Sequence, residues 1–326
     1  MYLGHDVVGR CRRLLEPALR EAVSGLHPWG ARMAAFTLGW SDADGSPLPG
    51  ETGKHVRPAI ALLCAEAVGA PASQALPGAV AVELVHAFSL VHDDIIDHDE
   101  RRRHRDALWK AYGIGPAILA GDSLLALAIA HLGQVGDQRA SGYLATALID
   151  LVHGQSQDMT FEDRPWTGPG AVTAEEYVEM AAGKTGALLG AAAALGVTLG
   201  GAAELADPLW RMGRDLGVAF QIADDLLGIW GDPAETGKPV HNDLRRAKKT
   251  LPVLAALPEV APYLERAVTD EELREVAELI DRAGGRDTAL ALAQHHLGAA
   301  LAVLDEVLPG AEALRAVCAE LVDRSR

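Results

Sequence analysis

The sequence is poor in cysteine and in positive charge, and each shortage excludes a class of protein. Its three cysteines, Cys11, Cys64 and Cys318, are odd in number and far apart, which fits neither a disulfide framework nor a metal site. A reducing cytoplasm is therefore expected. The 29 basic against 45 acidic side chains give a formal charge of −16, which argues against a nucleic-acid-binding surface.

Strongly apolar runs are scarce as well. The longest uncharged stretch, residues 185–203, is mostly Ala and Gly, which is too weakly apolar to predict a membrane span. A closely packed buried helix is the favoured interpretation. The first residues show no basic stretch followed by an apolar run, so no secretory leader is expected. We therefore expect a cytoplasmic protein without an integral membrane segment.

Residues that favour helices are what the sequence has in abundance. Hydrophobic residues make up 49% and aromatic residues only 5%, and most apolar side chains are Ala, Leu and Val. This composition is typical of helices rather than strands. Helical periodicity recurs along the chain and is interrupted by Gly and Pro. Helices are predicted over residues 57–68, 77–98, 116–134, 137–158, 173–182, 185–200 and 204–230, with shorter ones over 250–325.

The organisation of the chain indicates one domain. No repeat with a period of about 20 to 50 residues is found, and no low-complexity linker divides the chain. The segments rich in Pro and Gly, residues 41–53, 163–170 and 231–240, are loop-sized, and we expect them to group around a site. The predicted fold class is all-α, with a single all-helical domain over residues 1–326.

The most informative segment, residues 83–97, carries three aspartates on a predicted helix. Residues four apart share a helix face, so Asp93 and Asp97 project together. His86 lies on the same seam two turns earlier, and Asp94 is set to one side. Carboxylates crowded on an apolar helix would repel one another without a cation, and such hard oxygen ligands suit Mg²⁺. For this segment alone, a solvated acidic helix face is the alternative.

A second acidic segment repeats the arrangement, with Asp224 following Asp93 by 131 residues (224 − 93). A strongly apolar predicted helix carries, at positions i, i+3, i+4 and i+7, Gln221, Asp224, Asp225 and Gly228. Two such helices facing each other would form a metal-bridged diphosphate clamp. The repetition therefore favours a metal site over two unrelated acidic surfaces.

Basic residues stand beside both acidic segments, in residues 53–58, 101–103, 184–185 and 237–239. Arg binds phosphate bidentately and Lys acts as a point charge. Any one of these residues could form an ordinary surface ion pair. Together they indicate a phosphate-binding site, because an acidic chain concentrates its basic residues next to two acidic clusters.

The ordered motifs from about residue 53 to residue 252 strongly resemble those of the trans-isoprenyl diphosphate synthases, the polyprenyl synthetase family. The motifs that carry the resemblance are GKHVRP at 53–58, ELVHAFSLVHDDIID at 83–97, LAGDSLL at 119–125, GQSQDM at 154–159, KTG at 184–186, FQIADDLLGIWGDP at 220–233, TGKP at 236–239 and NDLRRAKKTLPV at 242–253. The resemblance implies an isoprenoid synthase bundle of roughly 12–15 helices around a central apolar cavity. It also implies Mg²⁺-dependent, head-to-tail trans condensation of isopentenyl diphosphate with an allylic diphosphate.

The resemblance assigns roles by position. In that family the two acidic helices hold three Mg²⁺ ions on the diphosphate of the allylic substrate. Direct metal ligation is implied for Asp93, Asp97 and Asp224, and support through water for Asp94 and Asp225. The residues implied at the allylic diphosphate are Arg102, Lys184, Thr185, Gln221 and Lys238. Those implied at isopentenyl diphosphate, which binds without metal, are Lys54, Arg57, His86 and Arg103.

The chemistry of the family accounts for these residue types. Ionising a carbon–oxygen bond needs a neutralised diphosphate leaving group, which Mg²⁺ and fixed cations provide. The carbocation then needs an apolar tunnel without water, and no protein nucleophile is required. Product length in the family depends on the fourth and fifth residues before the first aspartate, here Ser89 and Phe88. One small and one aromatic residue resemble the geranylgeranyl type, with plain core packing as the alternative for Phe88.

The chain departs from the family pattern in three places. Residues 102–107 read RRHRDA where relatives usually have a Gly-Pro turn, which leaves the placement of Arg103 open. Gly228 replaces the third aspartate of the second motif and removes one outer carboxylate. The lysine often found beyond that motif corresponds to Lys248 or Lys249, and the sequence does not choose between them.

Alternatives remain for the product and for the activity. The product could be farnesyl or a longer polyprenyl diphosphate. A class I terpene cyclase is disfavoured, because the candidate for its second motif, at Asn242 and Asp243, continues with Arg246 and Thr250 where Ser and Glu are needed. A non-catalytic partner subunit would usually lack one acidic motif. The resemblance also implies a homodimer.

Overall fold

A computed structural model describes residues 3–48, 53, 55–102, 105–232, 240–266 and 269–323, with side chains from Asp6 onward. The chain divides into two compact units. The first unit consists of residues 1–145, 191–207 and 310–317. The second unit consists of residues 146–190, 208–309 and 318–326.

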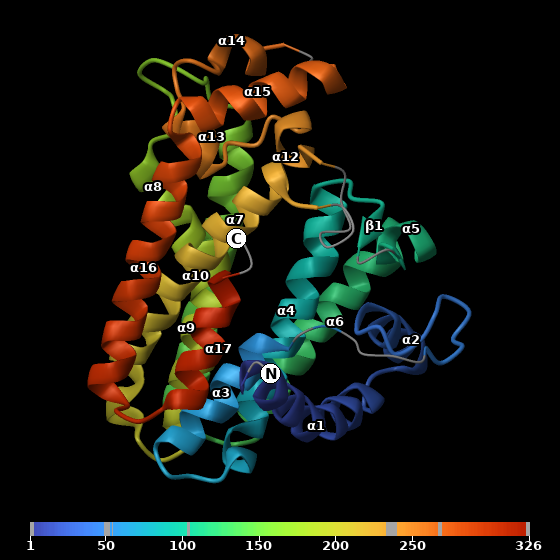
Figure 1. Ribbon diagram of the computed structural model, residues 1–326. Coiled ribbons are helices and arrows are strands. Elements are labelled where there is room, and N and C mark those ends of the chain that lie inside the picture. The colour runs from blue at the N-terminus through green and yellow to red at the C-terminus, as the bar shows by residue number, and fades with distance from the viewer. Residues whose placement is uncertain are drawn as a thin grey trace. The chain divides into compact units, whose positions relative to one another are not determined.

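The fold class is all-α, as predicted (Figure 1). The chain begins with α1 (Leu3–Ser24), α2 (Pro28–Thr37), α3 (Val56–Ala67), the 3-10 helix η1 (Ala72–Ala75), α4 (Leu76–Ile96), α5 (Leu108–Tyr112), α6 (Ile114–Gly133) and α7 (Gln138–Glu162). It continues with α8 (Ala174–Ala181), the π-helical turn η2 (Ala182–Gly186), α9 (Ala187–Leu199), the 3-10 helix η3 (Ala203–Leu205) and α10 (Ala206–Trp230). The last helices are α12 (Asn242–Arg245), α13 (Leu251–Ala255), α14 (Ala261–Leu264), α15 (Asp270–Arg282), α16 (Gly285–Val307) and α17 (Glu312–Val322).

The helices predicted between residues 57 and 230 agree with α3, α4 and α6–α10 to within a few residues at each end. The C-terminal part differs from the prediction, because α16 runs for 23 residues where only shorter helices were expected. The first helix, α1, was not predicted. Only one narrow face of α1 is buried, and the faces beside it are rich in charge. The buried residues on this face are four positions apart: Cys11, Leu15, Leu19 and Val23.

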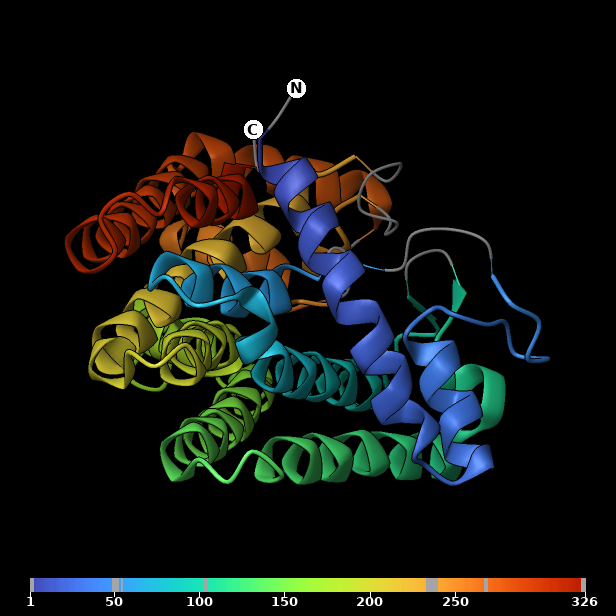
Figure 2. The same cartoon turned by 90° about the horizontal axis from the view of Figure 1, so that it is seen from below.

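Helix α4 is the main packing partner in the first unit, since it runs beside α6 and also contacts α3 (Figure 2). The segment after α4 forms a small antiparallel hairpin of β1 (Arg101–Arg102) and β2 (Arg105–Asp106), which was not predicted. The Arg105 guanidinium donates to the carbonyl oxygen of Ser41 at 2.8 Å. It also lies 4.4 Å above the ring of Phe36. These contacts hold the hairpin at the end of α2.

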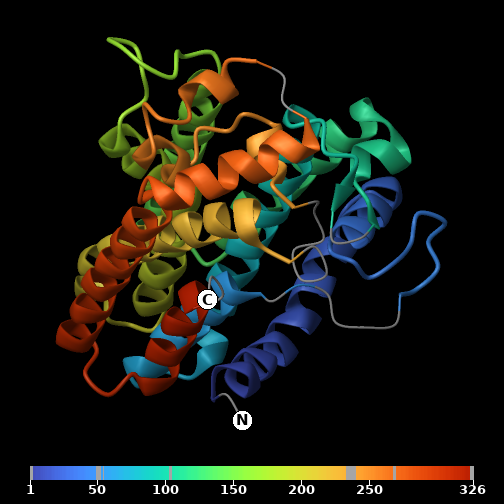
Figure 3. The same ribbon diagram turned by 45° about the horizontal axis from the view of Figure 1, so that its top comes forward.

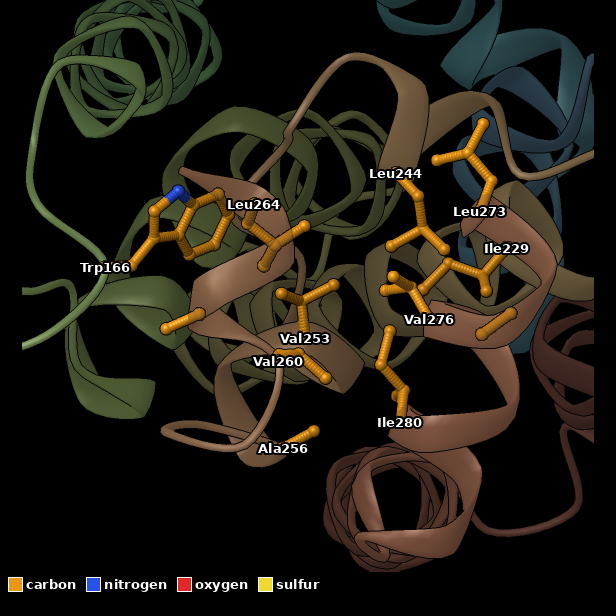
Figure 4. Packing of buried hydrophobic residues seen from close by; sticks show 12 residues of the cluster. Trp166, Ile229, Leu244, Val253, Ala256, Val260, Leu264, Leu273, Val276 and Ile280 are labelled. Atoms are coloured by element: carbon orange, nitrogen blue, oxygen red, sulfur yellow. The ribbon is translucent and has the colours of Figure 1, made fainter. Parts of the chain in front are cut away.

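The second unit is stabilised by a hydrophobic cluster that several short helices share (Figure 4). Trp166 of the loop after α7, Ile229 of α10 and Leu244 of α12 are each at most 7% exposed in this cluster. Residues from α13 to α15 complete it. Helix α15 lies beside α12, and α16 packs along α13 (Figure 3). The short helices after α10 are therefore held by tertiary packing, because helices of four or five residues are unstable alone.

Capping explains where two helices of the second unit begin. The Thr173 side chain accepts a hydrogen bond from the N–H of Glu176, and the Glu176 carboxylate accepts one from the N–H of Thr173, at 3.2 and 2.9 Å. Thr269 and Glu272 form the same capping box at the start of α15. Such reciprocal bonds satisfy backbone donors that the first helical turn leaves without partners.

Within the described residues, three helical stretches are long and apolar enough to cross a membrane, by length and composition only: Ala72–Ile96, Ile114–Gly133 and Ala174–Leu199. In the last stretch, 94% of the most apolar 18-residue window is buried within the protein, which confirms the prediction of a closely packed helix after residue 185. In the first stretch the corresponding share is 61%. Helix α6 differs, because only 28% of its most apolar 18-residue window is buried.

Candidate functional site

The first acidic motif lies at the C-terminal end of α4. Asp93 and Asp97 are both partly exposed, and the N–H of Asp97 donates to the carbonyl of Asp93 at 2.8 Å, as expected for residues one helical turn apart. Asp94 is only 3% exposed. The predicted division therefore holds: two aspartates share an accessible face, and the third points into the protein.

Asp94 is held by Arg102 of the hairpin. The Arg102 Nε donates to both Asp94 carboxylate oxygens at 2.9 Å, and its Nη2 donates to Oδ1 at 2.6 Å. Burial alone would lower the pKa of Arg102, but the hydrogen bond and charge of Asp94 raise it above its ordinary value. A permanently charged guanidinium is thus oriented beside the motif, at a position where the sequence analysis expected a diphosphate contact.

Residues at the start of α3 contact the middle of α4 through two side-chain pairs, each of which includes a histidine. Nη1 of Arg57 lies 3.3 Å from Nε2 of His86, so two of the residues expected at isopentenyl diphosphate are brought together. One turn earlier on α4, Oε1 of Glu83 lies 2.9 Å from Nδ1 of His55, and both side chains are at least 91% buried. This buried pair fixes the chain just before Arg57.

Three predicted site residues, Lys54, Arg103 and Lys238, lie outside the described residues. Their assigned roles stay predictions.

The second acidic motif, on α10, repeats the pattern of the first. Asp224 is exposed, whereas the adjacent Asp225 is only 6% exposed. Asp225 accepts hydrogen bonds from the Tyr177 hydroxyl at 2.5 Å, the Gln221 amide at 3.1 Å and the N–H of Leu251 at 3.3 Å. In both motifs, then, an accessible aspartate precedes a buried one that strong donors hold in place.

The hydrogen bonds around Asp225 extend to the KTG segment. Gln221 receives a hydrogen bond on its side-chain oxygen from the Thr185 hydroxyl, at 2.6 Å. Burial, with a further contribution from the charge of Asp243, raises the pKa of Asp225 to about 7. The bonds from Tyr177, Gln221 and the N–H of Leu251 act in the opposite direction. The network thus joins two residues expected at the allylic diphosphate to the buried aspartate.

The π-helical turn η2 carries Lys184 and Thr185. Nζ of Lys184 donates to Oδ2 of Asp158 on α7, at 2.5 Å. The turn is packed against its neighbours through glycine, since a Cβ on Gly217 of α10 would overlap the backbone of Gly186. Single π-helical turns recur at functional sites because they re-aim side chains within a helix. Here the turn directs a lysine and a threonine to residues of α7 and α10.

Carboxylate pairs of this kind fit magnesium. Within the part of the chain that the structure describes, no three His, Cys, Asp or Glu side chains come together closely enough to hold a metal ion. Mg²⁺ does not need such a cage, because it typically binds one or two carboxylates and completes its coordination with water and substrate phosphates. Asp93 and Asp97, one turn apart and partly exposed, are a donor set of that type.

Comparison with known proteins identifies the family. A model of the family described as polyprenyl synthetase matches residues 47–282. The chain belongs to the polyprenyl synthetase family. The recognition made from the sequence motifs is therefore confirmed, and the matched region includes both acidic motifs, the hairpin and η2.

Relatives within the polyprenyl synthetase family carry different product names. The chain is 43% identical over 307 residues to a (2E,6E)-farnesyl diphosphate synthase of Mycobacterium tuberculosis, which covers 89% of this chain and 84% of that protein. It is 40% identical over 320 residues to a geranylgeranyl diphosphate synthase of the same species, covering 94% and 90%. A solved polyprenyl synthetase from Streptomyces coelicolor has 44% identity and a TM-score of 0.90, covering 98% of this chain and 99% of that one.

The two residues that the family likeness connects with product length lie on α4, just before the first aspartate. Phe88 is 9% exposed, and its ring packs edge-on against His92 at 4.7 Å. His92 in turn lies against α6, where its Nε2 is 3.3 Å from the carbonyl oxygen of Ile118. The Ser89 hydroxyl donates to the carbonyl of His86 at 2.9 Å. Phe88 therefore packs against a histidine of α4 that itself contacts α6.

The surroundings of Lys248 and Lys249 differ in the structure, although the sequence did not distinguish their roles. Nζ of Lys249 donates to the carbonyl of Glu162 at 3.2 Å and lies 4.3 Å from the ring centre of Trp166. Lys249 is only 8% exposed, and burial lowers its pKa. Lys248 is partly exposed. Lys249 thus belongs to the packing of the second unit, which leaves Lys248 as the candidate for substrate.

Sequence reasoning assigned no role to four charged or polar residues at the site: Glu83, Asp158, Tyr177 and Asp243. Glu83 and Asp158 stand inside motifs that carried the family likeness, so those motifs were the available signal. Tyr177 lies outside every quoted motif, and its place beside Asp225 depends on how α8 packs on α10. Asp243 stands inside the quoted motif at 242–253 and was otherwise considered as part of an alternative terpene cyclase motif.

Proposed function

We propose that the protein is a Mg²⁺-dependent prenyltransferase that condenses isopentenyl diphosphate with an allylic diphosphate, head to tail and in trans, to make geranylgeranyl diphosphate. The observation that carries this proposal is the pairing in both acidic motifs of an accessible aspartate with a buried, strongly hydrogen-bonded one. Family membership supports the same reaction class.

The allylic diphosphate is proposed to bind at both acidic motifs. Mg²⁺ would be held by Asp93, Asp97 and Asp224, and when bound it would neutralise the leaving diphosphate as a Lewis acid. Asp94 orients Arg102, and Asp225 holds Gln221, so the buried aspartates act through their neighbours. The residues proposed to contact the allylic diphosphate are Arg102, Lys184, Thr185, Gln221, Lys238 and Lys248.

Isopentenyl diphosphate is proposed to bind at the start of α3, at Lys54, Arg57, His86 and Arg103. The proximity of Arg57 to His86 supports this assignment, because it places the Arg57 guanidinium, a phosphate-binding group, beside the His86 imidazole. The carbon–oxygen bond of the allylic substrate breaks, the isopentenyl double bond attacks the allylic carbon, and a proton leaves to the released diphosphate. The carbocation formed in this step requires surroundings from which water is excluded.

Product length is proposed to depend on Phe88, with Ser89 beside it. Phe88 is one residue further from Asp93 than Ser89; it is buried, and its ring packs on His92. The farnesyl name of one relative and the geranylgeranyl name of another leave farnesyl diphosphate as the second candidate product.

The working form is proposed to be a cytoplasmic homodimer. Helix α6 exposes large apolar side chains, namely Ile114 (51%), Ile118 (41%), Leu119 (56%) and Ile129 (52%), while Asp122 is its one charged residue. A helix face with several exposed large apolar side chains is costly to leave in water, and a second copy of the same face would cover it.

Incubation of purified protein with isopentenyl diphosphate, each allylic primer in turn and Mg²⁺, followed by chromatographic sizing of the product, tests the activity. Turnover is expected with Mg²⁺, and chelation by EDTA should abolish it reversibly. The absence of turnover with every primer would reject the function.

The same assay tests the assignment of Phe88. We expect a geranylgeranyl product from the unaltered protein and longer products from Phe88→Ala. The matched control is Phe161→Ala, another buried phenylalanine (4% exposed) in the second unit, which should leave the product unchanged. A farnesyl product, or an unchanged product from Phe88→Ala, would reject the assignment of Phe88.

A further inference from the structure

The segment after the first acidic motif lacks the Gly-Pro turn of the family pattern, since residues 102–107 read RRHRDA. It nevertheless forms an antiparallel hairpin, in which Arg102 of β1 is paired with Arg105 of β2. Hairpins with such short strands are unstable on their own. Side-chain contacts must therefore hold this hairpin, and with it the Arg102 guanidinium, in place.

Arg105 ties β2 to the end of α2 and to the loop that follows α2. Its Nη2 donates to the carbonyl oxygen of Ser41 at 2.8 Å, and its Nη1 donates to that of Phe36 at 3.3 Å. The guanidinium also lies 4.4 Å from the ring centre of Phe36, and Nη2 is 3.8 Å from the Asp42 carboxylate. A planar guanidinium can make all these contacts at once, whereas the single ammonium group of lysine cannot.

The loop that receives Arg105, residues 38–48, is itself anchored within the first unit. Two side chains donate to the carbonyl oxygen of Ala43 in this loop: the Tyr112 hydroxyl of α5 at 2.7 Å, and Nη2 of Arg32 of α2 at 2.6 Å. Along the chain, the loop comes shortly before residues 53–58, which include residues assigned to isopentenyl diphosphate. Arg105 thus connects the hairpin to a fixed part of the protein.

The other strand of the hairpin is anchored at the first acidic motif. Arg102 donates to both carboxylate oxygens of Asp94. The N–H of Ala107 donates to the carbonyl of Glu100 at 2.9 Å and closes the base of the hairpin. The hairpin therefore has two anchors, Asp94 through Arg102 and the loop 38–48 through Arg105. Because Arg102 and Arg105 are paired, releasing one strand would also release the other.

We propose that Arg105 is a positioning residue for diphosphate binding, which holds the hairpin of Arg102 against the loop that precedes residues 53–58. This proposal rests on the proposed function, because the groups to be positioned are those assigned to the two substrates. Arg105 itself would contact neither substrate, since its guanidinium faces carbonyl oxygens and a ring of the protein. Its loss should therefore weaken the binding of both diphosphates and affect the chemical step less.

Arg105→Lys tests this role, because it keeps the charge but loses the planar group. Steady-state kinetics of the full-length protein with Mg²⁺ should show the KM for isopentenyl diphosphate and for the allylic diphosphate each raised by about 10-fold, as expected when a hydrogen bond from a charged group is lost. The kcat should change by less than about 3-fold, because an effect on KM alone indicates lost uniform binding. Calorimetric titration with inorganic pyrophosphate and Mg²⁺ should show a similar loss of affinity without turnover.

The matched control is Arg20→Lys. The Arg20 guanidinium also lies over an aromatic ring, that of Trp40 at 4.3 Å, and donates to Glu16 at 2.7 Å, and both partners lie outside the hairpin. This substitution should leave both KM values and the pyrophosphate affinity unchanged. Hydrogen exchange of the Ala107 N–H should become faster in Arg105→Lys and stay the same in Arg20→Lys, since it reports opening of the hairpin. Circular dichroism should show both variants folded.

Unchanged KM values and pyrophosphate affinity in Arg105→Lys would overturn the proposed role of Arg105, and so would a fall in kcat alone. In either case the proposed function would stand, as long as the unaltered protein condenses isopentenyl diphosphate with an allylic diphosphate. A lack of turnover in the unaltered protein would instead remove the proposed function. The pyrophosphate affinity and the hydrogen exchange of Arg105→Lys would still decide whether Arg105 positions the hairpin.

Discussion

At the scale of single residues, the buried aspartates Asp94 and Asp225 differ from the accessible ones in what they can do. Asp94 is occupied by the Arg102 guanidinium, and Asp225 by Tyr177, Gln221 and a backbone N–H. A buried carboxyl group with this many donors is a rigid support, because losing any donor leaves a buried acceptor oxygen short of a partner. We therefore regard both as positioning residues for the groups that would contact substrate.

Replacing Tyr177 by Phe tests the support of Asp225. The variant loses the hydroxyl that donates to Asp225 and leaves that oxygen with fewer donors in a buried place. We expect the free energy of unfolding, measured by urea titration, to fall by about 1–3 kcal/mol.

The control for Tyr177→Phe is Tyr143→Phe. The Tyr143 hydroxyl also donates to a carboxylate, that of Asp207, but this pair is exposed to solvent. Water can replace the lost hydroxyl there, so the change in stability should be clearly smaller. Equal losses in the two variants would show that burial of Asp225 is not what makes its hydrogen bond important.

At the scale of elements, η2 and α10 approach each other more closely than side chains would permit. Gly217 of α10 faces Gly186 at the end of η2, and a Cβ at either position would meet backbone atoms. This contact sets the distance between Thr185 and Gln221, which share a hydrogen bond of 2.6 Å. The glycines therefore control the geometry of polar residues that lie next to them.

Replacing Gly217 by Ala should separate η2 from α10. We expect a loss of about 1–3 kcal/mol in the free energy of unfolding, which is typical of overpacking, together with lower turnover as Lys184 and Thr185 move. Gly298→Ala is the control, because Gly298 lies exposed within α16 with nothing within 4 Å of its added methyl group. That substitution should raise the free energy of unfolding by about 0.5–1 kcal/mol. Gly217→Ala and Gly298→Ala are therefore expected to change stability in opposite directions.

At the scale of the whole molecule, the chain passes five times between the two compact units. Neither unit is a continuous segment, and α7 and α17 each contribute residues to both. A single domain over residues 1–326 remains our proposal. The exposed apolar residues of α6 belong to the first unit alone, and they make α6 the surface proposed for association with a second copy.

Scanning calorimetry of the purified protein tests whether residues 1–326 behave as one domain. We expect one transition in which calorimetric and van't Hoff enthalpies agree, because chain crossings of this kind prevent either unit from unfolding independently. Two separate transitions would argue for two domains.

Replacing Leu119 by Asp tests the proposed dimer surface. A charge on the exposed face of α6 should convert the dimer into a monomer of 34.3 kDa, measured by light scattering after size exclusion. Leu14→Asp, an exposed leucine of α1 (39% exposed), should leave the dimer intact. A monomer before any substitution, or binding of the unaltered protein to lipid vesicles through α6, would contradict the proposal.

Much of the site could be predicted from the sequence because its residues are close along the chain. Asp93, Asp94 and Asp97 lie within two turns of one helix, and so do Gln221, Asp224 and Asp225, so helical geometry alone separates their faces. The apolar residues around them indicated burial, and the structure agrees for Asp94 and Asp225. The hairpin at Arg102 was missed, since two-residue strands have no period to detect.

The amino-acid sequence by itself determined the helical class, the two acidic motifs and the family, because each depends on neighbours within a few residues. Only the tertiary structure decided the partners of those motifs: Tyr177 for Asp225 and Asp158 for Lys184. These pairs are separated by 48 and 26 residues (225 − 177, 184 − 158). Local propensity carries no information about which distant side chain fills a given space, and packing of the helices supplies it.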